Sequence, residues 1–194
     1  MKQYKYGSYK EYVKAQRKGY QKKKDRVWAR EENIKAIADY LKDHGVMSGI
    51  CHGVRGGQEV DWFRLHLDAQ VIGTEIGDAE GNYIVQWDFN RPNEKWLREF
   101  DFVYSNAFDH SFDPRMTLAV WLDQLKPGGV LIIETDERNE HTGDISKPVN
   151  PTDPTGLTLG ELVQLMRDVS GSEVTIIDLP VITFGYRKAV AVEV

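Results

Sequence analysis

The chain has 194 residues, enough for one domain with its own core, and its 41% hydrophobic and 11% aromatic residues are typical of a globular protein. No apolar run approaches the ~20 residues that a membrane-spanning helix needs, and no apolar segment resembling a secretory signal follows the charged N-terminus. The one cysteine, Cys51, excludes an internal disulfide and a cysteine-rich zinc site. We therefore expect a cytoplasmic protein with no membrane partner.

Positive charge is concentrated at the N-terminus. Residues 1–30 contain eleven Lys or Arg and two acids, a net charge of +9; the whole chain carries −5, so the remainder carries −14. Tyrosines alternate with these cations, and the pattern predicts one or two short helices that break near Gly19. This basic helical arm can meet an anionic small molecule or a nucleic acid, or it can fold back on its own acidic body.

The centre of the fold is expected between Met47 and Glu75. A short apolar run enters a glycine turn, residues 52–57; a helical pattern follows through residue 67, and a second strand-like run ends at Glu75. Strand, glycine turn, helix, strand and acid form the arrangement of a nucleotide-binding crossover, in which the glycines let a ligand approach the backbone. A glycine turn with a purely structural role is the alternative.

The rest of the chain continues the alternation of strands and helices. Helical spacing predicts helices over residues 31–44, 93–98, 116–125 and 159–169, and apolar runs predict strands over 82–89, 100–104, 130–133, 174–177 and 184–194. The last two strands have no helix between them and should pair antiparallel. Residues 31–194 are thus expected to form one α/β domain, a three-layer sandwich whose seven-stranded, mostly parallel sheet has an antiparallel last strand.

Two runs in the second half of the chain carry a family resemblance. They are Phe100-Asp-Phe-Val-Tyr-Ser-Asn-Ala-Phe-Asp-His-Ser-Phe-Asp-Pro114 and Leu125-Lys-Pro-Gly-Gly-Val-Leu-Ile-Ile-Glu134. The first resembles the fourth-strand motif of the class I S-adenosylmethionine-dependent methyltransferases, and the second resembles that family's turn into its fifth strand. The helix-free final strand pair is a further mark of that sheet. The resemblance covers roughly residues 31–194 and implies S-adenosylmethionine as cofactor and S-adenosylhomocysteine as product.

One departure from the family concerns the glycine turn. The family commonly has an acid at the end of the first strand and three glycines at fixed spacing after it. Here Gly49 or Ile50 stands in the place of the acid, and two of the glycine positions match. The resemblance therefore does not identify what holds the amino group of the cofactor, and a non-catalytic cofactor-binding relative is an alternative.

The resemblance implies roles for residues at the ends of the predicted strands. Glu75 would bind the ribose hydroxyls, Asp88 would accept a hydrogen bond from the adenine amino group, and Phe89 would line the adenine. Arg55 would pair with the cofactor's carboxylate. The complete expected cofactor-binding set is His52, Gly53, Arg55, Gly56, Glu75, Ile76, Asp88, Phe89, Ser105 and Asn106.

Methyl transfer from a sulfonium is an in-line displacement, so the protein chiefly aligns the acceptor and excludes water. A base is needed only when the acceptor must lose a proton, and His110 is the first candidate because imidazole titrates near neutrality. Asp109 is the second candidate, and His141 in the long polar loop of residues 136–156 is a third. A hydrogen bond at a helix entry is the structural alternative for His110. No cluster has convincing metal-ligand spacing, so we predict no metal.

We expect a methyltransferase that acts on a small, anionic or polar acceptor, with residues 1–30 and 136–156 closing over the site. A nucleic-acid methyltransferase that grips RNA with the basic arm is the main alternative. The Pro-Pro-aromatic motif of DNA amine methylation is missing after Asn106, and Cys51 is misplaced for attack on cytosine. A nicotinamide oxidoreductase is disfavoured by the final strand pair. The oligomeric state is open, with a homo-oligomer among the possibilities.

Overall fold

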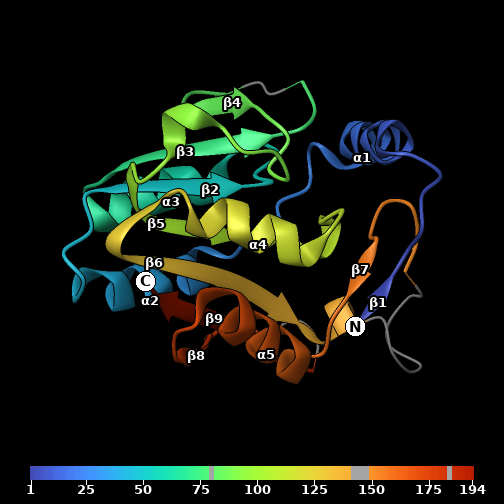
Figure 1. Ribbon diagram of the computed structural model, residues 1–194. Helices are drawn as coiled ribbons and strands as arrows, with labels where there is room; N and C mark the ends of the chain where they lie inside the picture. The colour runs from blue at the N-terminus through green and yellow to red at the C-terminus, as the bar shows by residue number, and fades with distance from the viewer. Residues whose placement is uncertain (79–80, 141–148, 183–184) are drawn as a thin grey trace.

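The computed structural model describes residues 1–78, 81–140, 149–182 and 185–194. Its main sheet has seven strands in the order β4-β3-β2-β5-β6-β9-β8 (Figure 1). Strand β9 is antiparallel to both of its neighbours, and the pairs among the first five strands of this order are parallel. This confirms the predicted sheet. The strands are β2 (Ser48–His52), β3 (Gln70–Glu75), β4 (Ile84–Gln86), β5 (Phe100–Ser105), β6 (Leu125–Asp136), β8 (Val174–Asp178) and β9 (Arg187–Glu193).

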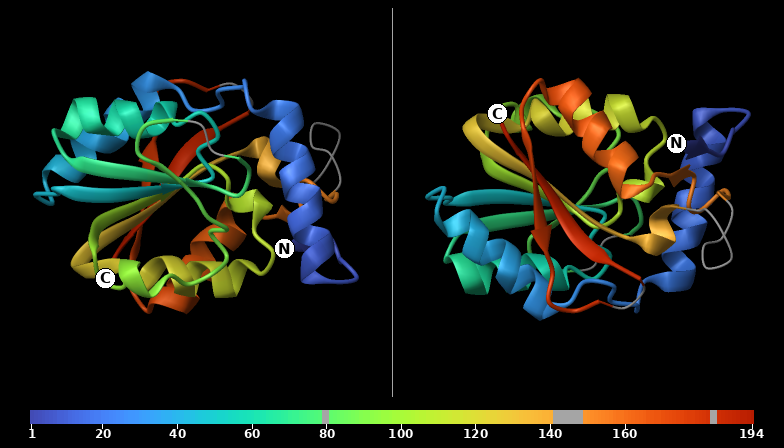
Figure 2. Two further views of the ribbon diagram at one scale, coloured as in Figure 1. Left: turned by 90° about the horizontal axis from the view of Figure 1, so that it is seen from above. Right: turned by 90° about the horizontal axis from the view of Figure 1, so that it is seen from below.

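Helices cover both faces of the sheet, as Figure 2 shows from opposite sides. Helices α2 (Glu31–Lys42) and α3 (Gln58–Leu67) pack on one face, and α4 (Pro114–Leu122) and α5 (Leu159–Ser170) pack on the other. Each helix turns an apolar stripe towards the sheet, which gives two cores on either side of it. The largest fully buried side chains include Phe63, Phe102 and Tyr104 in the first core and Leu118, Trp121 and Leu131 in the second.

Helix α1 (Tyr9–Lys23) lies across the end of the sheet at which the parallel strands finish (Figures 1 and 2). The predicted break near Gly19 is wrong, because the helix runs through this glycine without interruption. Gly19 is buried, and a Cβ at this position would lie 3.3 Å from Cγ2 of Thr152. The glycine therefore lets the helix pack closely on residues 149–154, and this packing offsets its low helix propensity.

Several connections differ from the sequence prediction. The predicted helix over 93–98 is a single 3₁₀ turn, η1 (Glu94–Trp96), and two more such turns are η2 (Phe108–His110) and η3 (Glu137–Glu140). The Lys-Pro-Gly-Gly segment lies inside β6 as an irregularity of its pairing with β5. A two-stranded sheet joins β1 (Lys2–Gln3) to β7 (Thr155–Gly156). Within the described ranges no helix is long and apolar enough to cross a membrane.

Gly49 in the central strand β2 gives a direct test of this packing. A Cβ there would lie 2.2 Å from Cε1 of Phe102, so Gly49→Ala should lower the free energy of unfolding by about 1–3 kcal/mol through overpacking. Gly160→Ala in the exposed first turn of α5 is the matched control, since a Cβ there meets no atom within 4 Å. It should leave stability unchanged or raise it by up to about 1 kcal/mol. Urea denaturation measures both; equal midpoints would contradict the β2 packing.

Candidate active site

Two adjoining cavities lie where the ends of the parallel strands meet α1. The larger has a volume of about 220 Å³ and the smaller about 40 Å³. They share part of their lining, so they lie side by side along the edge of the sheet, and the two together are called the recess below. The shared residues are Lys23, Gly53, Arg55, Ala107 and His110.

The glycine turn after β2 brings the backbone up to both cavities. Gly53 has φ +76°, and a Cβ on it would lie 2.6 Å from Cβ of Ala107. Gly57, just before α3, has φ +80°, and a Cβ there would lie 2.8 Å from Cδ1 of Ile84. Both positions therefore require glycine for conformation and for space. The turn leaves room for a ligand to lie directly against the main chain.

The smaller cavity collects acids from the ends of β3 and β4. Glu75 is 5% exposed, and its two carboxylate oxygens accept hydrogen bonds from the backbone N–H groups of Arg55 (2.9 Å) and Gly77 (3.2 Å). Because a carboxylate has about four acceptor sites, two such bonds leave capacity for a ligand hydroxyl. Asp88 accepts from the Tyr9 hydroxyl at 2.6 Å and from the Asn90 side chain at 2.8 Å. Ile76 and Phe89 complete this wall.

One side of α1 forms the opposite wall of the smaller cavity. Tyr12, Gln16, Gly19 and Tyr20 recur at helical spacing and are the buried residues of this helix. The Tyr12 hydroxyl donates to the carbonyl of His110 (3.1 Å), the Tyr20 hydroxyl donates to the carbonyl of residue 78 (2.7 Å), and Gln16 donates to that of residue 151 (3.3 Å). These bonds fix α1 to three separate loops. The recess is therefore roofed by the N-terminal helix.

A buried ionic network forms the floor of the larger cavity. Glu134 in β6 accepts from the Arg187 guanidinium and from the Tyr104 hydroxyl, and the side-chain amide of Asn33 donates to it at 3.4 Å. Arg187 also donates to the carbonyl of Trp28 at 2.9 Å. The Arg187 and Glu134 side chains are 5% and 1% exposed. The network therefore ties the segment between α1 and α2 to the sheet.

Trp28 lines the larger cavity and has two arginines near its ring, of which Arg138 is ion-paired with Asp136. Trp28 is 38% exposed. The guanidinium carbons of Arg55 and Arg138 lie 5.8 Å and 5.1 Å from the centroid of its ring, within the range of cation–π attraction. Arg26, Val27 and Asn139 line the same cavity. A polar or planar ligand group can therefore contact both an aromatic face and positive charge here.

A second buried acid, Glu59, lines the larger cavity from the first turn of α3. It is 6% exposed, and burial raises the pKa of its carboxyl to about 8. Glu59 is not among the site residues predicted from the sequence. Its spacing could have indicated that it is buried, because Glu59 and Phe63 are four residues apart and therefore lie on the same face of the helix.

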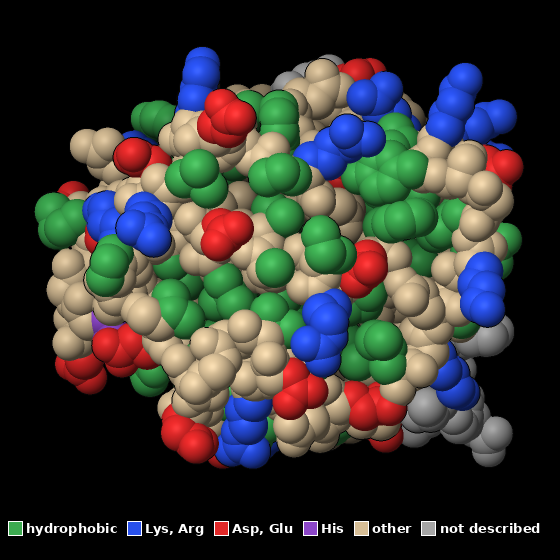
Figure 3. Space-filling model, in the orientation of Figure 1, with side chains coloured by type: hydrophobic (Ala, Val, Ile, Leu, Met, Phe, Trp, Pro, Cys, Tyr) green, Lys and Arg blue, Asp and Glu red, His purple; other side chains and the backbone are tan. Residues whose placement is uncertain are grey.

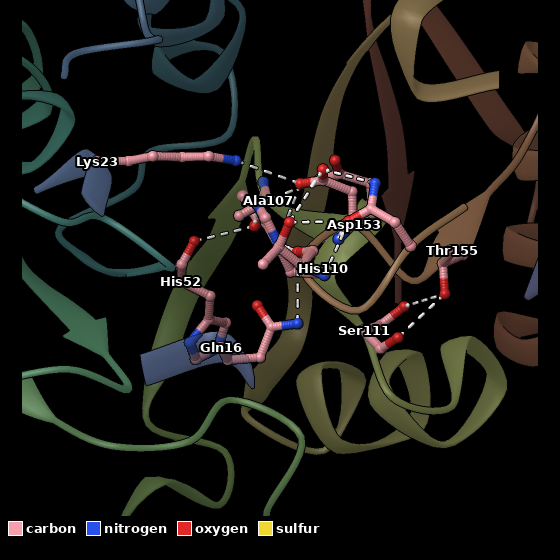
Figure 4. Close-up of polar contacts among 12 residues, drawn as sticks. Gln16, Lys23, His52, Ala107, His110, Ser111, Asp153 and Thr155 are labelled. Carbon is pink, nitrogen blue, oxygen red and sulfur yellow. Dashed lines mark hydrogen bonds and ion pairs between the residues drawn. The ribbon is translucent and has the colours of Figure 1, made fainter. Parts of the chain in front are cut away.

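His110 belongs to a polar cluster at the junction of both cavities. Figure 4 shows Lys23, His110 and Asp153 converging from separate parts of the chain. Nδ1 of His110 is in hydrogen-bond contact with the carbonyl of Thr152, Asp153 Oδ1 lies 3.8 Å from the same nitrogen, and Asp109 Oδ1 lies 3.9 Å from Nε2. A carbonyl can only accept, so Nδ1 carries the proton and Nε2 is the basic nitrogen.

Asp109, His110 and Asp153 are also the one group in the described part of the chain whose ligand atoms, all within 4.8 Å, could hold a metal ion. Lys23 lies 3.5 Å from Asp153, and Nδ1 of His110 is engaged by Thr152. These contacts make the cluster an anchor between α1 and the turn at residues 150–153. His141, the third candidate base, lies outside the described residues.

The predicted site residues divide into two groups. Gly53, Arg55, Glu75, Ile76, Asp88, Phe89, Asn106, Asp109 and His110 line the recess. Gly56 is not among the lining residues, and Ser105 is buried and donates to the carbonyl of His52 at 2.9 Å. The His52 side chain, expected near the cofactor, points into the core instead. Its ring centroid lies 4.9 Å from that of Trp121, and its nitrogens contact Thr74 (2.8 Å) and Gln124 (2.9 Å).

Neither a protein-family model nor a curated protein matches this sequence, whereas many solved structures match its fold. The 1,6-didemethyltoxoflavin-N1-methyltransferase of Burkholderia thailandensis, solved with 1,6-didemethyltoxoflavin and S-adenosylhomocysteine bound, superposes with a TM-score of 0.71. The two sequences are 18% identical, and the match covers 98% of this chain and 92% of that one. The chain has the fold of the S-adenosylmethionine-dependent methyltransferases.

Two further solved methyltransferases support the assignment of the methyltransferase fold. An S-adenosylmethionine-dependent methyltransferase from Aquifex aeolicus has a TM-score of 0.62 and 16% identity over 91% of this chain and 97% of that one. A possible histamine N-methyltransferase from Thermotoga maritima has a TM-score of 0.57 and 19% identity over 95% and 94%. Identities of this size establish the fold alone.

Buried His52 predicts a pH dependence of stability. Burial lowers the pKa of its imidazole from 6.5 to about 4, so the unfolded chain binds a proton between these values that the folded chain does not. The contribution of His52 to the free energy of unfolding is therefore fully present above pH 6.5. As the pH falls towards 4, this contribution decreases by about 3 kcal/mol. The difference in unfolding free energy between the wild type and His52→Gln, from urea titrations, should shrink by that amount from pH 6.5 to 4. A constant difference would contradict the buried neutral imidazole.

Proposed function

We propose that this protein is an S-adenosylmethionine-dependent methyltransferase that acts on a small molecule. The observation that carries the proposal is the recess itself. A narrow cavity with two acids at the ends of adjacent parallel strands lies directly beside a wider one, and the same histidine lines both. The first part, at about 40 Å³, has room for only a water or two, so the nucleoside assigned to it requires α1 to move away from the strand ends; the reactive group and its acceptor are assigned to the second.

The residues of the smaller cavity suit an adenosine. Glu75 is buried, faces the cavity and keeps acceptor capacity, which matches two adjacent ribose hydroxyls. Asp88 would accept from the adenine amino group in exchange for its bond to the Tyr9 hydroxyl. The bare backbone at Gly53 permits close approach, because a side chain there would fill the space in front of Ala107. These residues therefore fit the cofactor.

The acceptor proposed for the larger cavity is small and polar. The cavity of about 220 Å³ must also hold the amino-acid end of the cofactor, so little volume is left for an acceptor. Its lining has five Lys or Arg and five Asp or Glu, a balance that favours a polar acceptor; an anionic group would lie at the Arg-flanked ring of Trp28. The roof formed by α1 limits the acceptor's size further.

The packing of α1 favours a small acceptor over a nucleic acid. Base stacking by α1 would need exposed rings, but two of its tyrosines are buried, Tyr12 at 1% and Tyr20 at 8% exposed; the exposed ring of the arm, Trp28 at 38%, lines the larger cavity. Lys and Arg side chains do project near α1, at the upper right of Figure 3. Surface cations alone give weak, salt-sensitive contacts to phosphates. The buried tyrosines serve the roof of the recess instead.

The cofactor would supply an activated methyl group on a sulfonium. The residues of the chain would align the acceptor with that group and exclude water. His110 lines both cavities, and its basic Nε2 would accept a proton from an acceptor N–H or O–H. Asp109, 3.9 Å from that nitrogen, would stabilise the imidazolium that results. Asn106, which follows β5 and lines the larger cavity, would orient the acceptor.

Replacing Glu75 tests the cofactor assignment. Glu75→Ala removes the buried acceptor for the ribose and should weaken binding of S-adenosylhomocysteine by about 30-fold or more, since hydrogen bonds to a charged group contribute about 1.5–3 kcal/mol. Isothermal titration calorimetry measures the change. Glu94→Ala, an exposed acid on η1, is the control and should bind as the wild type does. Unchanged affinity in Glu75→Ala would refute the ribose site, and no binding to the wild type would refute the proposed function.

Replacing His110 tests the proposed base. His110→Gln should lower kcat for methyl transfer by about 10²-fold or more and leave the affinity for S-adenosylhomocysteine within a few-fold. The readout is transfer of a labelled methyl group to a panel of small heterocyclic, amine, phenol and carboxylate acceptors, with binding measured in parallel. If kcat is unchanged with an active acceptor, the histidine only anchors the turn at Thr152.

A further inference from the structure

Glu59 is a buried acid that the functions assigned above do not use. It lies at the second position of α3, faces the larger cavity, and is 6% exposed. Burying a carboxylate is costly unless a cation or several hydrogen bonds compensate it. Such a side chain in the wall of a cavity is an acceptor available to a positively charged ligand group.

The groups around Glu59 do not neutralise it. Glu134 and Glu75 add negative charge, and Arg55 is the cation that acts on Glu59 most directly. Arg187, which lines the same cavity, is paired with Glu134. The Cys51 thiol and the Tyr104 phenol also face Glu59, and burial raises the pKa of each, so both are neutral near pH 7.

We infer that Glu59 binds the α-ammonium group of S-adenosylmethionine while Arg55 takes the carboxylate of the same amino-acid end. The inference rests on the proposed function. An α-amino acid carries both charges on one carbon. Arg55 offers a cation and Glu59 an acid that can ionise, four residues apart in one wall of the cavity. Glu59 would thus replace the acid that the family commonly has at the end of its first strand, a position that Gly49 or Ile50 of β2 takes in this chain.

This assignment has a consequence that a merely structural acid would not have. Without ligand, the Glu59 carboxyl has a pKa of about 8 and is mostly protonated at pH 7. An ammonium group beside it favours the carboxylate, so the proton is released to solvent when the ligand binds. Binding should therefore release close to one proton per ligand at pH 7. Affinity should rise about 10-fold from pH 6 to 7, a range that lies below the ordinary pKa of an α-amino group.

The test is calorimetric titration of the full chain with S-adenosylhomocysteine, in buffers of different ionisation enthalpy, which reports the protons released. Glu59→Gln keeps the shape of the protonated side chain, and thermal unfolding checks that it folds. The Glu59→Gln substitution should abolish proton release on binding and remove the pH dependence of the affinity. It should also weaken binding roughly 30-fold at pH 8. Glu32→Gln, an exposed acid in the first turn of α2, is the matched control and should behave as the wild type.

A second ligand locates the interaction on the amino-acid end. 5′-Deoxy-5′-methylthioadenosine keeps the nucleoside and lacks both the ammonium and the carboxylate, so it should bind without proton release and with equal affinity to wild type and Glu59→Gln. The contribution of His110, which lines the same cavity, is common to both proteins and cancels in the comparison.

The outcomes separate the two proposals. If S-adenosylhomocysteine binds wild type and Glu59→Gln equally, with equal proton release, Glu59 does not hold the ammonium and the proposed function stands. Proton release that also accompanies the methylthioadenosine overturns the ammonium assignment as well. If neither ligand binds the wild type at millimolar concentration, the proposed function fails, and the role of Glu59 fails with it.

Discussion

The parallel pairing of β2 with β5 at the centre of the sheet is the constraint on which the recess depends. After β2 the chain turns to α3 on one face, and after β5 it turns to α4 on the other. The two connections diverge, so a crevice opens beyond the ends of these strands. Close contact between the strands at Gly49 and Phe102 keeps this geometry, and the residues that follow each strand must then face the crevice.

Helix α1 turns that open crevice into an enclosed recess. Its buried stripe of two tyrosines, Gln16 and Gly19 rests on loops that follow β3, β4 and β5. Enclosure lowers the local dielectric, which strengthens each charge interaction inside and raises the pKa of Glu59. The basic character noticed in the sequence belongs to the outer surface of this helix, whereas its inner surface is aromatic. The arm and the sheet together therefore make the site.

Much of the fold could be predicted because buried strands and amphipathic helices have strong sequence patterns. The positions of Glu75 and Asp88 at one edge of the sheet followed from where the apolar runs end. The orientation of His52 did not follow, because successive strand residues point to opposite faces and the last residue of a strand is hard to assign. Its ring fills space beside Trp121 in the core.

Features in which tertiary packing overrides local preference could not be predicted from the sequence. Gly19 predicted a helix break, yet contact with Thr152 holds the helix intact. The spacing of Tyr12, Gln16, Gly19 and Tyr20 is a helical stripe that could have predicted the roof. Glu59 was missed because it belongs to no known motif. It is unusual in being an acid on the buried face of α3, and the cavity in front of it accounts for that position.

A crystal structure of the protein with S-adenosylhomocysteine tests the account most directly. The account predicts the ribose hydroxyls within hydrogen-bond distance of Glu75, the adenine beneath α1 beside Phe89, and the amino-acid end between Arg55 and Glu59. A nucleoside bound elsewhere, or a recess that stays closed to the ligand at saturating concentration, would contradict it and leave the methyltransferase fold without this cofactor site.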